Sequence, residues 1–175
     1  MKIGIISDSH KKVGRAIKGI DYLISQGAEY IIHSGDIVKV EVLEYLKKSG
    51  IVYLAVYGNN DSHLFKYHKD FNLVQEPYYF KIKNLKIKLM HHPYFMVPDV
   101  DLIVYGHTHI AHSQTNGETL FINSGEVCAR DLPVSKVALV EVFENKFIVN
   151  SYEREIGSIH WKNITFNYKK IKIKS

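Results

Sequence analysis

The chain has 175 residues, of which 46% are hydrophobic, so it can hold one domain with an ordinary buried core. No stretch approaches the ~20 continuous apolar residues that cross a membrane, and we expect no membrane association. The net charge of +5 lies in residues 156–175, which hold five lysines and no acid, while the other 18 basic residues equal the 18 acidic ones. A nucleic-acid partner is therefore disfavoured, because DNA binding needs a basic face on the fold itself.

Two features bear on the compartment. Residues 1–6 run straight into a strand pattern without a small-residue cleavage site, so we expect no secretory signal. Cys128 is the one cysteine in the sequence, which excludes an internal disulfide and fits a reducing environment. These features predict a cytoplasmic protein.

The first third of the chain alternates between strand and helix patterns. Short apolar runs predict strands, and two segments with apolar residues at helical spacing, each followed by a glycine, predict helices. This alternation predicts parallel strands joined by right-handed crossovers. The expected strands are residues 2–7, 30–33 and 51–57, and the expected helices are residues 13–25 and 40–48.

From about Pro77 onward, strand patterns follow one another with little helical periodicity between them. Asn84, Asn116-Gly117 and Glu144-Asn145 are typical of hairpin turns. We predict an α/β fold in which two sheets pack face to face with helices outside. The expected strands of this part are residues 78–82, 85–90, 102–105, 119–122, 137–143 and 147–152.

The last twenty or so residues carry a separate strand pattern. Ile164, Phe166 and Tyr168 alternate, and Ile171 and Ile173 alternate in the opposite phase, which predicts a bulged strand or an edge strand blunted by lysines. We therefore expect a single domain over residues 1–155 and a basic C-terminal extension over residues 156–175, either an edge strand or a tail.

Polar side chains follow five of the predicted strands at the point where each strand ends. In open α/β sheets, ligands bind at this carboxyl edge. The glycines in these motifs let the backbone turn sharply and approach a site closely. The five motifs are Asp8-Ser9-His10, Gly35-Asp36, Gly58-Asn59-Asn60-Asp61, His91-His92 and Gly106-His107-Thr108-His109.

Each motif taken alone also has a structural interpretation, since Asp and Asn after a strand commonly form turns or cap helices. Five motifs at one edge favour a site instead. Two Asp, one Asn and four His supply mixed oxygen and nitrogen donors, which suit Mn, Fe, Ni, Co or Zn. Mg and Ca prefer shells made only of oxygen and fit poorly.

The five motifs, in this order, resemble the signature of the calcineurin-like metallophosphoesterases, in particular their small single-domain phosphodiesterases from bacteria and archaea. The resemblance covers about residues 1–153. It implies a four-layer α/β/β/α sandwich of two packed mixed sheets with outer helices. It also implies hydrolysis of a small phosphodiester or phosphomonoester by a hydroxide that bridges two divalent metal ions. Manganese is the first choice for both ions, with Ni, Fe, Co or Zn as alternatives.

The resemblance assigns the ligands residue by residue. One metal would take Asp8, His10, Asp36 and His109, and the second would take Asp36, Asn59, His91 and His107, with Asp36 bridging. It also marks Asp36, Asn59, His10 and Asn60 as the expected catalytic residues, and Asn60, Asp61, Asn123 and Ser124 as the residues near the substrate.

The chain departs from the family pattern at two places in the site. Many relatives carry a histidine at the position of Asn60, where it stabilises the transition state or protonates the leaving oxygen. An amide cannot act as an acid near neutral pH, so the leaving-group acid is left open. Residues 92–105 are short and contain Pro93 and Pro98 where relatives place a helix, so we expect a lowered pocket wall.

Smaller expectations concern single residues. Asp61 either orients the Asn59 loop or forms its turn, and Asn123-Ser124-Gly125 resembles the family's Asn-Pro-Gly-Ser loop beside the metals. Cys128 reads as a small buried hydrophobe rather than a nucleophile. The remaining histidines divide into rim or surface candidates, His63, His92 and His112, and structural ones, His33, His68 and His160.

Three functions are compatible with these motifs. The leading one is a metal-dependent hydrolase of a small phosphate ester. A metal-binding scaffold with little activity is the alternative, because a retromer subunit of the same fold has lost several ligands and works through protein contacts. A nuclease is the third, and the neutral body of the chain opposes it. Homo-oligomer formation is left open.

Overall fold

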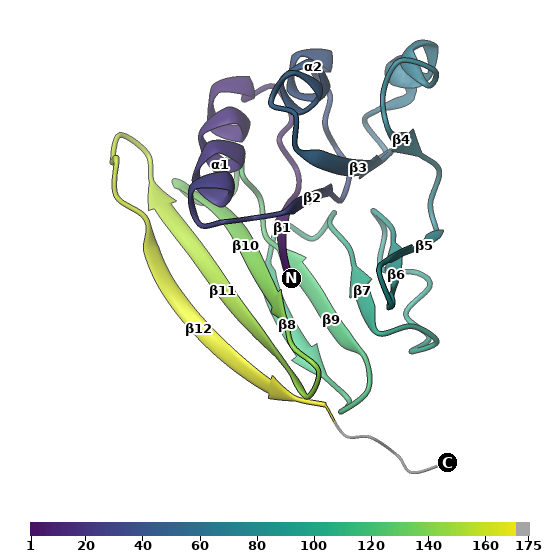
Figure 1. Cartoon of the computed structure of the whole chain (residues 1–175). Coiled ribbons are helices and arrows are strands. Elements are labelled where there is room, and N and C mark those ends of the chain that lie inside the picture. Colours follow the sequence, from purple (N-terminus) through teal and green to yellow (C-terminus); the bar gives the residue numbers. More distant parts are fainter. Residues whose placement is uncertain (171–175) are drawn as a thin grey trace.

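Two β-sheets lie face to face, and both α-helices cover the outer side of one of them (Figure 1). The computed structural model describes residues 1–170, so the predicted strand positions Ile171 and Ile173 lie outside the described residues. The helical elements are α1 (Val13–Ser25), α2 (Val40–Lys48) and the short 3₁₀-helix η1 (Ser62–Tyr67).

The first sheet has seven strands in the order β12-β11-β10-β1-β2-β3-β4. Strands β1 to β4 are parallel, and β10, β11 and β12 continue the sheet in antiparallel fashion. Its strands are β1 (Lys2–Ile6), β2 (Tyr30–His33), β3 (Val52–Val56), β4 (Leu73–Val74), β10 (Val134–Val142), β11 (Lys146–Glu155) and β12 (Lys162–Lys169).

The second sheet has five strands in the order β5-β6-β7-β9-β8, with β6, β7 and β9 parallel. Its strands are β5 (Tyr78–Ile82), β6 (Leu85–Leu89), β7 (Leu102–Val104), β8 (Ala111–Thr115) and β9 (Leu120–Ser124). The predicted α/β class with two packed mixed sheets is therefore confirmed.

The core follows from the two-residue period of the strands. On β1, Ile3 and Ile5 face the second sheet and pack in one cluster with Ile87 and Leu89. Ile6 points the other way, into the cluster formed with the apolar stripe of α1 and α2. Each sheet face is thus buried by a separate set of side chains, which fixes the register of β1.

A loop covers the outer face of the five-stranded sheet. Met96 and Val100 pack on Met90, Ile103 and Phe121 there. The buried Lys88 ties this loop down, because its ammonium donates to the carbonyl oxygens of Phe95 (3.1 Å) and Val97 (2.8 Å) and pairs with Asp99. Within residues 1–170 this segment contains no helix, as the short spacing and the prolines predicted.

Candidate metal centre

Five loops at the carboxyl ends of β1, β2, β3, β6 and β7 carry the seven predicted ligands to one place. Each of the seven side chains lies within 4 Å of at least one other. The ligands are Asp8 and His10 after β1, Asp36 after β2, Asn59 after β3, His91 after β6, and His107 and His109 after β7.

The backbone at most of these positions is strained. Left-handed conformations are uncommon for residues other than glycine, and such strain clusters at functional sites. Five of the seven predicted ligands have positive φ angles: Asp8 (52°), His10 (44°), Asp36 (52°), His107 (66°) and His109 (60°). The loops therefore hold these side chains in directions that an ordinary turn would not give.

Two glycines permit the loops to meet. A Cβ added to Gly58 would lie 2.2 Å from the amide nitrogen of Asp36. One added to Gly35, whose φ is +95°, would lie 2.5 Å from Nδ1 of His91. Any side chain at these positions would displace a predicted ligand.

One half of the centre is formed by Asp8, His10 and His109. Oδ1 of Asp8 lies 3.3 Å from Nε2 of His109, which lies 3.4 Å from Nε2 of His10. The Ser7 hydroxyl donates to Oδ2 of Asp8 at 2.6 Å. Burial raises the pKa of Asp8, but the neighbouring His109 and Ser7 side chains lower it by more, so the carboxylate stays charged.

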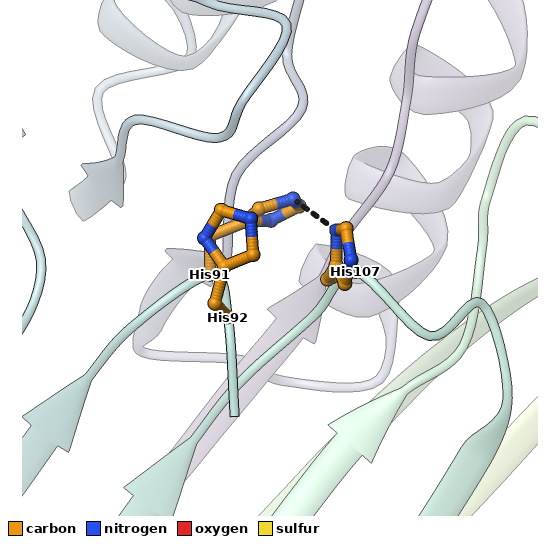
Figure 2. A group of neighbouring side chains, drawn as sticks. All are labelled: His91, His92 and His107. Carbon is orange, nitrogen blue, oxygen red and sulfur yellow. Dashed lines mark hydrogen bonds between the residues drawn. The ribbon is translucent and has the colours of Figure 1, made fainter. Parts of the chain in front are cut away.

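The other half is formed by Asn59, His91 and His107. Oδ1 of Asn59 lies 3.0 Å from Nε2 of His91 and 3.1 Å from Nδ1 of His107. Figure 2 shows these two rings with the 3.3 Å contact between their nitrogens as a dashed line. Because Nδ1 of His91 donates to the carbonyl oxygen of Ser34 at 2.8 Å, its Nε2 is left with a free lone pair.

Asp36 lies between the two halves. Its Oδ2 is 3.8 Å from Nε2 of His10 and 3.6 Å from Nε2 of His91. Asn60 holds this carboxylate with two hydrogen bonds, from its backbone nitrogen to Oδ1 (2.9 Å) and from its side-chain amide to Oδ2 (2.7 Å). Asn60 thus contacts Asp36 directly.

These residues fit divalent metal ions. Oδ1 of Asp8 is buried and makes no hydrogen bond within the described residues, which is costly unless a cation contacts it. In each half, two imidazole nitrogens face each other at about hydrogen-bond distance, with a carboxylate or amide oxygen beside them. The described residues contain groups of this kind that could hold a metal, including Asp8-His10-His109 and Asp8-Asp36-His91.

The other predicted residues lie behind the centre. The carboxylate of Asp61 is buried, which raises its pKa, and it accepts hydrogen bonds from the amides of Gly58 (2.8 Å), Ile37 (3.0 Å) and Val38 (2.7 Å). Asp61 therefore ties the Asn59 loop to the Asp36 loop.

Asn123 and Ser124 also support a loop. The amide of Asn123 donates to the carbonyl oxygen of Gly106 (2.9 Å) and to the hydroxyl of Thr108 (3.0 Å), so it braces the loop that carries His107 and His109. Ser124 is buried and donates to the carbonyl oxygen of Gly125.

Sequence reasoning missed an acidic and basic cluster around His109. Nδ1 of His109 lies 3.0 Å from carboxylate oxygens of both Glu126 and Asp131, which leaves Nε2 to face the centre. The Arg130 guanidinium lies 3.4 Å from Nε2 of His10 and 3.3 Å from both ring nitrogens of His109. No motif spacing singles out these residues.

A second missed residue is Glu76, next to β5. Its carboxylate accepts hydrogen bonds from the amides of His91 (2.6 Å) and His92 (2.8 Å) and lies 2.6 Å from Nδ1 of His92. His92, a rim candidate, packs beside His107 with ring centroids 4.4 Å apart (Figure 2).

His33 is buried beneath the centre and links two of its loops. The Gly35 amide donates to Nδ1 of His33, so Nε2 carries the proton and donates to the Ser9 hydroxyl at 3.1 Å, which donates to the Ile37 carbonyl. Burial lowers the pKa of His33 from 6.5 to about 4. The neutral ring is therefore part of the native hydrogen-bond network.

This network predicts acid sensitivity of the fold. Because the folded pKa lies below the unfolded one, the unfolded chain gains the proton first, so stability is full above pH 6.5 and is lost as the pH falls toward 4. Metal-free protein should lose about 2 kcal/mol of unfolding free energy between pH 7 and 5 through this group. Urea unfolding at both pH values should show a flatter pH dependence for His33→Gln, and equal slopes in the two proteins would contradict the assignment.

The two packed mixed sheets and the metal-compatible cluster at their loops define a metallophosphoesterase-like fold and site. The chain belongs to the calcineurin-like phosphoesterase superfamily, whose domain model matches residues 1–145. A curated relative, phosphodiesterase MJ0936 of Methanocaldococcus jannaschii, is 28% identical over 160 residues, which cover 84% of this chain and 96% of the relative.

Solved structures agree with this membership. One described as a novel archaeal phosphodiesterase is 25% identical, with a TM-score of 0.71 over 95% of this chain and 100% of that chain. Vps29 of Entamoeba histolytica complexed with zinc is 21% identical, with a TM-score of 0.67 over 94% of this chain and 99% of that one, and shows the shared fold. In residues 1–170 no helix is long and apolar enough to span a membrane.

Proposed function

We propose that this protein is a metal-dependent phosphodiesterase that hydrolyses a small phosphate ester, with a phosphomonoester as the second choice. The observation that carries the proposal is the position of Asp36 between two groups of nitrogen and oxygen donors, within 4 Å of a histidine of each. Membership of the phosphoesterase superfamily and the likeness to an archaeal phosphodiesterase support the same chemistry.

Two divalent ions fit this arrangement, with manganese as first choice and Ni, Fe, Co or Zn as alternatives. Asp8, His10, Asp36 and His109 would hold one ion, and Asp36, Asn59, His91 and His107 would hold the other. When bound, paired ions lower the pKa of a coordinated water toward ~7 and neutralise charge on phosphate oxygens. Glu126 and Ser34 keep the His109 and His91 rings in the orientation and tautomer that ligation needs.

The surrounding residues take supporting roles. Asn60 orients Asp36 through its two hydrogen bonds, and Asp61 and Asn123 hold the loops that carry the ligands. In this proposal Asn60 is the supporting residue nearest the substrate, and Asp61, Asn123 and Ser124 lie behind it. Asn60 cannot donate a proton to a leaving oxygen as an acid would, so we expect leaving groups that depart easily, such as aryl or phosphate groups.

Arg130 should bind the phosphate of the substrate. Its Nε pairs with Asp131 at 3.2 Å, and its two terminal nitrogens lie 3.3–3.4 Å from His10 and His109. Each terminal nitrogen carries two N–H groups, so the guanidinium can also donate to an anion beside these histidines. Arg130→Met should raise KM for a phosphate ester and weaken inhibition by inorganic phosphate by about 10- to 100-fold. Unchanged KM and inhibition constants, with Lys69→Met as the charge-matched control, would contradict this role.

The function is tested with protein stripped of metal and then reloaded. Manganese-loaded protein should hydrolyse an aryl phosphodiester, metal-free protein should not, and reloading should restore the rate. Full metal binding without hydrolysis of any ester in a panel of diesters, monoesters and cyclic nucleotides would favour the scaffold alternative. Preferential cleavage of a single-stranded oligonucleotide would favour a nuclease.

A cytoplasmic location agrees with the single cysteine. Cys128 is buried, and burial together with the Glu126 carboxylate raises the pKa of its thiol to about 12, so it stays protonated. It therefore behaves as a packing residue and not as a nucleophile. Fractionation of the native cells with an antibody to the chain would test the location.

A further inference from the structure

A strongly basic pocket opens beside the N-terminus of α1, and none of the seven predicted ligands lines it. It has a volume of about 460 Å³ and lies where α1 approaches the turn between β11 and β12 (Figure 1). None of its lining residues is acidic, and five of them are cationic: Lys11, Lys12, Arg15, Lys18 and Arg154. The neutral charge of residues 1–155 as a whole therefore conceals a local concentration of positive charge.

The helix terminus adds to this positive charge. Lys12 precedes α1 without a side-chain cap, and the first turn of α1 contains no acid. Within residues 1–170, the amides of Val13 and Gly14 have no hydrogen-bond acceptor, and both residues line the pocket. Free amides at the start of a 13-residue helix attract anions through their N–H groups and the helix dipole.

The second, independent observation is the buried guanidinium of Arg154, on β11. Arg154 is only 6% exposed, its Nε has no hydrogen-bond partner in the described part of the chain, and one terminal nitrogen donates to the Ser158 carbonyl at 2.9 Å. The ring of Trp161 lies 5.3 Å from its central carbon. Buried charges are normally paired, because an unpaired one loses its hydration without compensation.

The acids nearest to Arg154 in sequence are engaged elsewhere. Glu153 pairs with Lys136 at 3.1 Å, and Glu155 pairs with Lys162 at 2.6 Å. Arg15 also lines the pocket, and its guanidinium donates to the carbonyl oxygen of Cys128. Burial, followed by the like charge of Arg15, lowers the pKa of Arg154. A bound anion would remove both the repulsion and the unpaired charge.

We propose that this pocket is a phosphate-binding site, separate from the predicted metal ligands. Residues with guanidinium, ammonium and free amide donors line it, and the three-oxygen face of a phosphate group can accept from several of them at once, which a carboxylate cannot. Lys11 and Lys12 follow His10 directly, so the pocket adjoins the candidate metal centre. If the proposed function holds, the pocket would take a second phosphate of the same substrate.

The binding test removes the metal centre from the measurement. Inorganic pyrophosphate is titrated by calorimetry into full-length protein kept metal-free with a chelator, and one site per chain is expected. Lys12→Glu/Lys18→Glu should weaken binding by at least about tenfold, since both exposed charges then repel the anion. The charge-matched control, Lys69→Glu/Lys86→Glu, alters two exposed lysines outside the pocket and should bind as the unaltered protein does.

The outcome is decided by this comparison. Absence of binding to the unaltered protein, or equal weakening in both double variants, would overturn the proposal. Arg154→Gln should also bind pyrophosphate more weakly. If the Arg154→Gln protein does not fold, the variants of the exposed lysines still decide the test. Neither result depends on catalysis, so the pocket and the phosphodiesterase function can fail separately.

A kinetic comparison then identifies the source of the phosphate. With metal-loaded enzyme, Lys12→Glu/Lys18→Glu should raise KM about tenfold for an ester bearing an additional phosphate, and leave KM for a simple aryl diester unchanged. This pattern supports a phosphate carried by the substrate. If the double variant has the same KM as the unaltered enzyme for both esters, and the unaltered protein still binds pyrophosphate, the occupant is a free phosphate anion.

Discussion

Asp36→Asn is expected to abolish hydrolysis and to deplete bound metal at both positions. The neutral amide loses the charge that two cations would share, and its nitrogen would face the side-chain amide of Asn60 in place of Oδ2. A rate loss of at least ~1,000-fold, about 4 kcal/mol of transition-state stabilisation, should accompany metal content near zero. Metal analysis of the purified variant is the decisive measurement.

Two comparisons make this result specific. Asp8→Asn should weaken mainly one position, because the side chain of Asp8 lies against the ring of His109 (3.3 Å), whereas from His107 it accepts only a hydrogen bond of the backbone amide (3.2 Å). Asp70→Asn alters an exposed loop residue and should change neither metal content nor rate. Near-full metal occupancy in the Asp36 variant would refute its bridging position.

Gly58→Ala should unfold the centre without changing any ligand. The added methyl group would lie 2.2 Å from the Asp36 amide nitrogen and 2.3 Å from its Oδ1, and Asp61 holds both loops in place, so neither can move aside cheaply. Overpacking of this kind lowers the free energy of unfolding by ~1–3 kcal/mol, and by more when the clash is with backbone atoms. Urea unfolding and metal affinity should both fall together.

Gly14→Ala is the matched substitution for stability. No atom lies within 4 Å of an added Cβ there, and alanine in a helix is favoured over glycine, so stability should be unchanged or rise by ~0.4–1 kcal/mol. If the Gly58→Ala protein were as stable as the Gly14→Ala protein and bound metal normally, the Asn59 and Asp36 loops could not approach each other as closely as described.

The front half of the fold could be predicted closely because its signals are local. The helical periodicity that ends before Gly27 and Gly50 placed α1 and α2 at the bounds observed. Strand β8 was missed because its sequence, Ala111–Thr115, is polar and half-exposed at a sheet edge, so no apolar alternation marks it. The two-residue strand β4 and the helix η1 are too short to carry a period.

The gathering of the seven predicted ligands at one edge could be predicted because each lies in the loop that follows a strand. Glu126, Arg130 and Asp131 lie in an irregular segment after β9, and only the folded chain brings them to His109. The basic pocket was not predicted from the sequence for a related reason. Its cations come from the loop before α1, from α1 itself and from β11, which is distant in sequence. A sum of charges over residues 1–155 cannot show that they lie close together.

The left-handed backbone of five predicted ligands also constrains how this chain can diverge. After glycine, asparagine tolerates that conformation best. Valine or isoleucine would lose the contacts of the original side chain and would also strain the backbone. A duplicate copy freed from selection for hydrolysis should therefore accumulate asparagine and glycine at Asp8, Asp36 and His109 before any branched residue. Such a copy would keep its loops, its sheets and its surface while losing the proposed ion-binding side chains, and would be free to take on a role in protein assembly.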